Sequence, residues 1–97
     1  MIPIRKQGVI IREESDGNSI VFDSDSSSLF IMNSVGRSIF LSADGNHDLA
    51  GIAAVLKSSY SNICSICKND KELESEIEKY LNLLEKNRLI RFRGMDD

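Results

Sequence analysis

The stretch that decides the fold is "LFIMNSVGRSIF", from Leu29 to Phe40. Four apolar residues run together, Asn33 and Ser34 interrupt them, and apolar residues then recur at helical spacing. A strand with one face in water alternates apolar and polar residues, and Leu29–Met32 does not alternate. The stretch therefore predicts a strand whose second face needs a cover, followed by a helix that Asn33 or Ser34 caps.

Two further strands are expected before this stretch. The segments Gly8–Glu14 and Ser19–Asp23 are rich in β-branched residues. Asp16-Gly17 between them is a strong hairpin signal, because glycine accepts a positive φ without steric cost. The polar run Asp23–Ser28 is short enough for a second hairpin loop. The first third of the chain therefore predicts a three-stranded antiparallel meander.

Two helices are expected after the stretch. Val35, Ile39 and Phe40 share one face of the first, and Gly45 is expected to end it in a left-handed conformation. Asp48 is placed to cap the second helix, whose apolar stripe ends near Tyr60. Its apolar residues are Leu49, Ile52, Ala53, Val55 and Leu56.

The third helix has the clearest pattern. Asp70 is expected to cap it, and Asn87 is expected to end it in a left-handed conformation. The segment Arg88–Phe92 then forms a short final strand or packs its apolar residues on the core. The apolar positions of the helix follow the helical repeat: Leu73, Ile77, Tyr80, Leu81 and Leu84.

The resulting order, β-β-β-α-α-α, predicts an α+β, winged-helix-like fold. With 97 residues the chain is expected to be a single domain over 1–97, with its core at about 8–92. The composition, 41% hydrophobic and 28% charged, is typical of a soluble protein. No run is long enough to span a bilayer and the first ten residues lack a signal-peptide core, so we expect a cytoplasmic protein.

Catalytic and metal-binding patterns are weak. His47 is the only histidine and lies in a polar turn, where an exposed side chain is the expected state. Cys64 and Cys67 form a C-x-x-C pair, but a structural zinc site needs about four ligands and no third cysteine is present. We therefore expect no enzyme activity, no metal and no cofactor.

A winged-helix pattern usually suggests DNA binding. The third helix carries five Glu against three Lys, and the net charge is -3, so this face repels phosphates. A DNA-binding regulator stays open as the alternative, because basic residues near the two chain ends form one patch if the ends meet. These residues are Arg5, Lys6, Arg12, Arg88, Arg91 and Arg93.

The third strand is the remaining positive feature. No segment is expected to pair with its second edge, and it carries neither Lys nor Pro to block an incoming strand. Such an edge beside an amphipathic helix suits an extended peptide. Two alternatives are that the protein itself buries both faces of the strand, and that the strand pairs with its own copy in a homodimer.

The segment Phe30–Tyr60 resembles the PqqD family, whose domain recognises precursor peptides of ribosomally made natural products. The resemblance extends over about Gly8–Phe92 and includes a third helix, "ESEIEKYLNLLEKNRLI", similar to that of the family. Asp48 departs from the usual Thr, and Asn87 or Arg88 from the usual Gly. The matching positions are Met32-Asn33, Gly36, Ile39-Phe40 and Asp44-Gly45, with Ile52, Leu56 and Tyr60 in register.

The resemblance implies a non-catalytic chaperone. It would bind the leader of a precursor peptide and present the peptide to a modifying enzyme such as a radical SAM protein. The leader would add as a fourth strand beside the third strand, against the third helix. The implied strand contacts are Ser28, Leu29, Phe30, Ile31 and Met32, and helical spacing suggests Leu73, Glu76, Lys79, Tyr80 and Leu83 as the groove wall.

Overall fold

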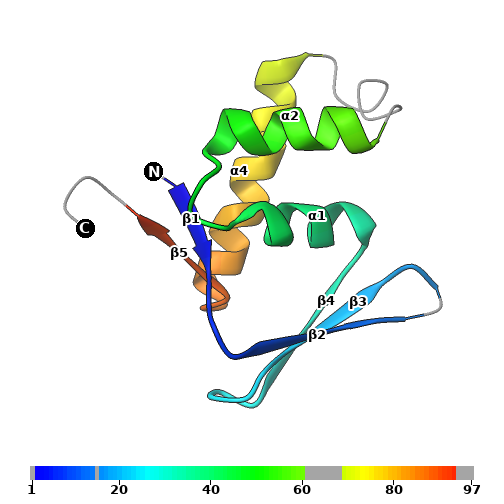
Figure 1. The fold of residues 1–97 in the computed structure, drawn as a ribbon, viewed down its shortest axis with the longest axis vertical. Helices are drawn as coiled ribbons and strands as arrows, with labels where there is room; N and C mark the ends of the chain where they lie inside the picture. The colour runs from blue at the N-terminus through cyan, green and yellow to red at the C-terminus, as the bar shows by residue number, and fades with distance from the viewer. Residues whose placement is uncertain (1, 15, 61–68, 94–97) are drawn as a thin grey trace.

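The computed structural model describes residues 2–14, 16–60 and 69–93. These residues form an α+β fold of two antiparallel sheets and three helices (Figure 1). The elements, in chain order, are β1 (Ile2–Arg5), β2 (Val9–Glu13), β3 (Ser19–Asp23), β4 (Ser28–Met32), α1 (Ser34–Ser42), α2 (Leu49–Ser59), α4 (Asp70–Lys86) and β5 (Ile90–Arg93). The predicted α+β class is confirmed.

The meander predicted from the sequence is present, with strand order β2-β3-β4. Gly17 has a φ of 87° in the first turn, where its N–H donates to the carbonyl of Glu14 at 3.2 Å. The register pairs Val21 with Phe30 and Asp23 with Ser28. Both predicted hairpins are therefore confirmed, and β4 lies at one side of the sheet.

A second sheet was not predicted. Strand β1 pairs antiparallel with β5, with Ile4 opposite Arg91 and Arg5 opposite Ile90. The final segment thus forms a strand, one of the two outcomes expected for it. Figure 1 shows this small sheet beside α4, while β2, β3 and β4 extend away from the helices. The described residues therefore have two strands beyond the predicted order β-β-β-α-α-α: β1 before it and β5 after it.

Side-chain caps start all three helices. Asn33 accepts from the amide of Gly36 and Asp48 from that of Gly51, both at 2.8 Å, as expected. The cap of α4 is Asn69, not Asp70, because its side chain accepts from the amide of Glu72 at 2.8 Å. Asp70 is the first residue of the helix instead.

Two helix ends differ from the prediction. Asn87 has an ordinary negative φ and its side-chain amide donates to the Leu83 carbonyl, whereas Arg88 takes the left-handed conformation with φ 61°. Gly45 is left-handed as expected, with φ 85°, but its N–H donates to the carbonyl of Pro3 at 3.1 Å. Gly45 therefore joins the turn after α1 to β1 rather than capping α1.

The core lies where the three helices meet the inner face of the sheet. Its centre is formed by α1 and α2 packed on α4, with Val21 and Met32 contributed from β3 and β4. Leu73, Ile77, Leu81 and Leu84 give α4 its buried stripe. Tyr60 ties α2 to the start of α1, because its hydroxyl donates to the Ser34 carbonyl at 2.9 Å.

The described ranges contain neither a helix that could span a membrane nor a group of side chains that could hold a metal ion. None of the helices in residues 2–14, 16–60 and 69–93 is both long and apolar enough to cross a membrane. Across the same ranges no group of three His, Cys, Asp or Glu side chains is arranged to hold a metal ion. Cys64 and Cys67, discussed above as a C-x-x-C pair, lie outside the described residues.

Candidate peptide-binding site

Strand β4 has one paired edge and one open edge. Its residues pair with β3 throughout, and within the described part of the chain no strand pairs with its other side. The backbone N–H and C=O groups on that side are available to a further strand. The unpaired edge expected from the sequence is therefore present.

The two faces of β4 differ in burial. Phe30 and Met32 point to the inner face, where Phe30 is half-buried and Met32 is 1% exposed. Leu29 and Ile31 point to the outer face and are 68% and 69% exposed. The unbroken apolar run thus has a physical basis, since both faces carry apolar side chains. Among the residues that the structure describes, none covers the outer face.

The outer face carries apolar side chains on all three strands, and Arg12 of β2 is the charged residue on it, opposite Ile20. Phe22 lies between Leu29 on one side and Ile10 on the other, and Ile20 lies opposite Ile31. Ile10 is 59% exposed. A peptide strand added to β4 would extend this surface, because its outward side chains would become the cross-strand neighbours of Leu29 and Ile31.

The sheet has a second open edge along β2, which is protected differently. Arg12 and Glu13 lie on β2, and Arg12 pairs with Glu14 at 3.2 Å. Charged side chains on an edge strand discourage pairing with another chain. Strand β4 carries no charged residue. Of the two edges, β4 is the one suited to an incoming strand.

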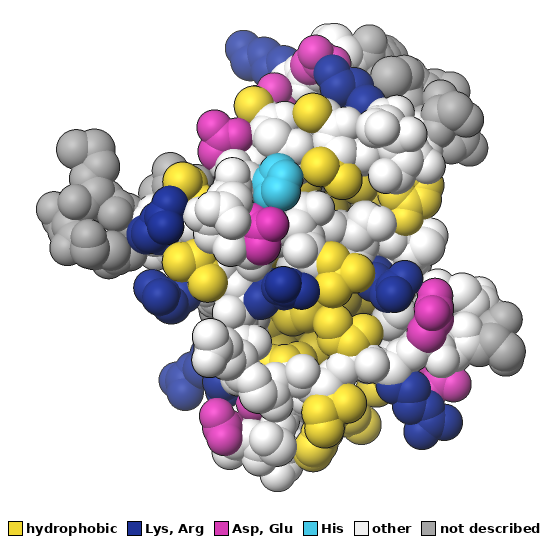
Figure 2. Space-filling model, in the orientation of Figure 1, with side chains coloured by type: hydrophobic (Ala, Val, Ile, Leu, Met, Phe, Trp, Pro, Cys, Tyr) yellow, Lys and Arg dark blue, Asp and Glu magenta, His cyan; other side chains and the backbone are white. Residues whose placement is uncertain are grey.

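A pocket of about 390 Å³ lies on the β2 side, between β2 and α1. Val9 and Ile11 line it from the strand and Phe40 from the helix. Figure 2 shows hydrophobic side chains in the hollow between the helices and the three-stranded sheet. The helices therefore cover the inner face of the sheet only in part: Val21 is buried in the core, whereas Val9 and Ile11 remain partly exposed at this pocket.

Helix α4 carries the residues that were predicted to form the second wall of the site. Tyr80 packs over Gly36 of α1, where a Cβ atom would overlap the end of the tyrosine ring. Burial raises the pKa of the Tyr80 hydroxyl above its usual value. Leu83, one turn further along, is 44% exposed. Tyr80 and Leu83 thus give this side of α4 an aromatic and an aliphatic surface.

The other predicted wall residues divide into two groups. Glu76 and Lys79 are exposed and form an ion pair with each other at 3.2 Å. Leu73 is 4% exposed and belongs to the core, so its side chain offers no surface to a ligand.

His47, expected to be an exposed turn residue, is part-exposed, and its Nδ1 lies 2.9 Å from Asp44 Oδ1. This contact lowers the pKa of the Asp44 carboxyl.

Sequence reasoning missed the residues that fix the start of β4. Asp23, opposite Ser28, is buried and accepts from the Lys6 ammonium at 2.8 Å. It also accepts from the Ser26 hydroxyl and the Asp25 amide, so one carboxylate fixes the loop that leads into β4. These contacts hold the pKa of Asp23 below its usual value, with the Lys6 hydrogen bond as the largest cause. Asp23 and Asp25 stand out in the sequence as an acidic pair, but the lysine that contacts Asp23 lies 17 residues away, so the sequence did not indicate it.

The fold and the open β4 edge define a small α+β domain with a strand available for pairing. The chain shares this fold with a solved structure described as "TbiB1 in Complex with the TbiA(beta) Leader Peptide". The TM-score is 0.71 at 14% sequence identity, over 94% of this chain and 98% of that one. No family model matches the chain, and no curated protein matches it. The resemblance to the PqqD family therefore stays a prediction.

Proposed function

We propose that this protein binds the leader of a ribosomally made precursor peptide by accepting it as a fourth strand beside β4. The main-chain groups on the open edge of β4 would supply the affinity. Phe30 on the inner side, and Leu29 and Ile31 on the outer side, would select the side chains of the leader. Tyr80 and Leu83 of α4 are the proposed wall against which the peptide lies.

The observation that carries this proposal is the contrast between the two edges of the sheet. The β2 edge bears charged residues, whereas β4 is open, uncharged and apolar on both faces. An exposed edge of this kind promotes aggregation unless something covers it. A peptide ligand satisfies the free backbone groups and covers part of the apolar surface at once.

The comparison with a solved structure supports the same proposal. The protein of that structure has this fold and is in complex with a leader peptide. With 14% identity, the likeness extends to the fold, and the transfer of peptide binding to this chain is our proposal. The family resemblance of the sequence points to the same class of ligand.

The proposed role of the domain is to position a substrate, with no chemistry of its own. Holding the leader raises the effective concentration of the attached core peptide at a modifying enzyme, and short tethers reach the millimolar range. A radical SAM protein is the proposed enzyme, on the basis of the family resemblance.

Isotope-labelled protein titrated with a synthetic leader tests this proposal. The leader is taken from a short precursor peptide encoded beside the gene of this protein. We expect the amide signals of Ser28–Met32 to shift on titration, and the outward-facing amides of β4 to become protected from hydrogen exchange. Shifts confined to other elements, with β4 unchanged, would contradict the proposal.

Proline substitutions test the use of the backbone. Amides alternate in direction along a strand, so of Phe30 and Ile31 one donates toward β3 and the other toward the open edge. We expect Phe30→Pro or Ile31→Pro, whichever keeps the wild-type circular dichroism and thermal unfolding, to abolish leader binding. Unchanged affinity in that folded variant would exclude strand addition. Light scattering at the same concentrations shows whether the free protein is a monomer or a homodimer paired through β4.

A further inference from the structure

The basic residues from the two ends of the described chain lie together. Pairing of β1 with β5 places Arg5 opposite Ile90 and Ile4 opposite Arg91. The amide of Lys6 continues the contact by donating to the carbonyl of Leu89 at 2.9 Å. The sequence predicted a basic patch on the condition that the two chain ends meet, and the pairing of β1 with β5 fulfils this condition. Arg12 is the exception, since it lies on β2 beside Glu14.

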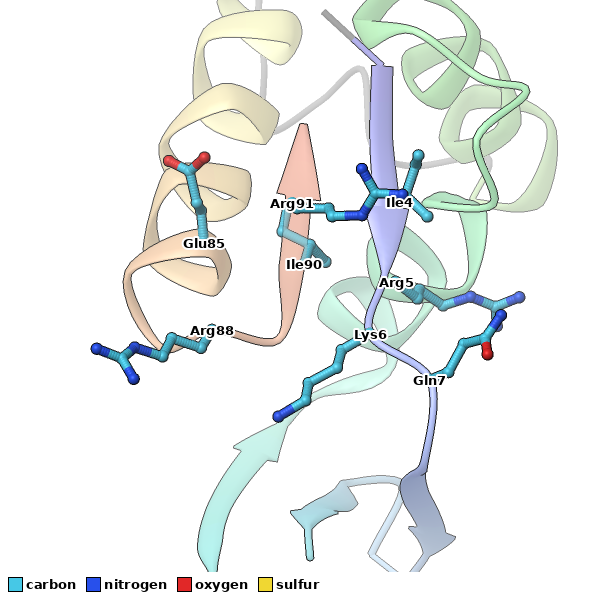
Figure 3. Close-up of a pocket in the computed structure, with 8 residues that line it drawn as sticks. All are labelled: Ile4, Arg5, Lys6, Gln7, Glu85, Arg88, Ile90 and Arg91. Carbon is cyan, nitrogen blue, oxygen red and sulfur yellow. The ribbon is translucent and has the colours of Figure 1, made fainter. Parts of the chain in front are cut away.

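These residues line an open pocket of about 490 Å³, which we call the basic cleft. Figure 3 shows that its side chains come from β1 and the connector after it, from the end of α4, and from β5. Four of its lining residues are cationic and one, Glu85, is acidic. The cationic ones are Arg5, Lys6, Arg88 and Arg91. A protein with a net charge of -3 thus concentrates positive charge at this cleft.

Two of the cations have no acidic partner inside the described ranges. Lys6 is engaged by Asp23 at 2.8 Å and by Asp25 at 3.4 Å. Arg5 and Arg88 form no ion pair with any residue in 2–14, 16–60 or 69–93. A guanidinium group presents paired N–H donors that match the two oxygens of a carboxylate. Figure 3 shows that the Arg5 and Arg88 side chains extend to opposite sides of the cleft. The two arginines therefore offer donors to different carboxylates of an extended acidic ligand, and not to a single carboxylate.

The basic cleft adjoins the start of the β4 edge. The backbone of Lys6 is bonded to Leu89, just after α4, and its side chain is bonded to Asp23, which lies opposite Ser28. One lysine therefore links Leu89, just after α4, to Asp23 of β3, which is the strand partner of the first residue of β4. All the neighbouring strands of this sheet are antiparallel. A peptide that joins β4 in the same way passes Met32 first and Ser28 last, and then reaches the cleft.

We propose that the basic cleft binds the carboxylates of an acidic segment that directly follows the edge-bound strand of the same peptide. This inference rests on the proposed function, and it assigns a direction and a charge to the ligand. The peptide would lie with its amino-terminal part near Met32 and its acidic part against Arg5 and Arg88. Binding at the cleft would then fix the register of the peptide strand relative to β4. Backbone pairing alone specifies that register weakly, because the apolar residues of β4 resemble one another.

A short peptide fits this charge distribution better than a nucleic acid does. The cleft is small, and α4 next to it carries Glu85 at the cleft and four further Glu along its length. An extended polyanion would meet this negative charge beyond the cleft. A few carboxylates on a flexible chain reach Arg5 and Arg88 without crossing the acidic helix.

Two labelled probes test the charge of the ligand. One is fluorescein-Gly-Glu-Glu-Ser-Glu-Glu, and the other has glutamine in place of each glutamate. We expect the acidic probe to bind at least about tenfold tighter at low salt, with shifts at the amides of Arg5, Arg88 and Ile90. Equal binding of both probes would overturn the proposal.

Matched variants then test the cleft. The double substitution Arg5→Gln with Arg88→Asn removes both free cations, and asparagine tolerates the left-handed conformation at position 88. We expect about tenfold weaker binding of the acidic probe to this variant, and unchanged binding to Arg12→Gln with Lys71→Gln, which removes two positive charges elsewhere. An equal loss in both would mean that the probe senses only overall charge, which overturns the site.

A pair of longer probes tests the link to β4. The strand-forming sequence Thr-Val-Thr-Ile-Thr is followed by the acidic segment in one probe and preceded by it in the other. We expect the first order to bind at least about fivefold tighter, and the β4 proline variant to remove this advantage but not the binding of the short acidic probe. If the short probe binds the cleft and neither order engages β4, the cleft stands and the proposed function fails.

Duplex DNA serves as the competing ligand. Tighter binding of a short duplex than of the acidic probe, with shifts at the same arginines and a steep dependence on salt, would overturn the proposal in favour of a nucleic acid. No binding of the duplex at low salt, together with binding of the acidic probe, supports an acidic peptide.

Discussion

The ammonium group of Lys6 lies 2.8 Å from Oδ2 of Asp23, and this ion pair connects the small β1–β5 sheet to the three-stranded sheet. Asp23 is almost fully buried and also receives the Ser26 hydroxyl and the Asp25 amide. Because Lys6 is bonded through its backbone to Leu89, the pair sets where β4 begins relative to the end of α4. The proposed binding edge and the basic cleft therefore depend on one contact.

This pair predicts an acid-sensitive fold. The folded-state pKa of Asp23 is below the usual value of 3.8, so its stabilisation is present above pH 3.8 and is lost as pH falls through the lower folded pKa. The folded-state pKa of Lys6 is above 10.5, so its stabilisation is complete below pH 10.5 and is lost as pH rises through the higher folded pKa. We expect Asp23→Asn to lower the urea midpoint at pH 7, and this difference from the wild type to shrink as the pH falls below 3.8.

The control for this measurement is Glu78→Gln, which removes an exposed carboxylate from α4. We expect this variant to follow the wild-type midpoint at pH 7 and at about pH 3. If Asp23→Asn lost the same stability at about pH 3 as at pH 7, ionisation of Asp23 would not be the source of the stabilisation.

Arg88 predicts a stabilising substitution. Its φ of 61° is left-handed, and this conformation costs a residue with a Cβ roughly 1–2 kcal/mol. Glycine avoids that cost but loses more entropy on folding, so Arg88→Gly is expected to gain about 0.5–1 kcal/mol in free energy of unfolding. Chemical denaturation measures the difference. Arg91→Gly, in the extended conformation of β5, is the control and should destabilise the protein.

Local signals in the sequence were sufficient for the elements next to the proposed site. Asn33, Asp48 and Gly17 act through contacts within three residues, so their roles follow from residue type and spacing. The same holds for the apolar stripe of α4. The error at Asp70 arises because Asn69 beside it is an equally good capping residue. The error at the other end has a different origin, since Arg88 is left-handed although Asn87 is the residue type that tolerates this conformation better.

The β1–β5 sheet could not be predicted in this way. Strand β1 has four residues, one of them Pro3, and its pairing partner is about 90 residues away in the chain. A short strand with a proline carries a weak local signal, and nothing local indicates a partner at that separation. The Lys6–Asp23 pair was missed for the same kind of reason, because its two residues lie 17 positions apart. The basic residues near the two chain ends could be predicted to form a patch only on the condition that β1 and β5 meet.

The contact of Gly36 with Tyr80 predicts that Gly36→Ala destabilises the wild-type protein but stabilises a Tyr80→Ala variant. A Cβ at position 36 would overlap the Tyr80 ring, so Gly36→Ala is expected to cost roughly 1–3 kcal/mol and to push the ring outward. In a Tyr80→Ala background the overlap is gone, and the same substitution should stabilise α1 by up to about 1 kcal/mol, since alanine is the better helix former. Thermal unfolding of the four variants gives the coupling. Equal costs in both backgrounds would show that Tyr80 does not restrict position 36.

The exposed side chains on the outer face of β4 are expected to contact the bound peptide. Leu29 and Ile31 are 68% and 69% exposed, so Leu29→Thr and Ile31→Thr should change the free energy of unfolding by less than about 0.5 kcal/mol. Each should nevertheless weaken a leader that pairs with β4 by roughly 0.2–1 kcal/mol, because a cross-strand contact is lost. Ile10→Thr is the matched control, since Ile10 lies on the same face but on β2, two strands from the open edge. Titration calorimetry should show unchanged affinity for Ile10→Thr. Equal weakening by all three substitutions would mean that the ligand covers the face of the sheet and not its edge.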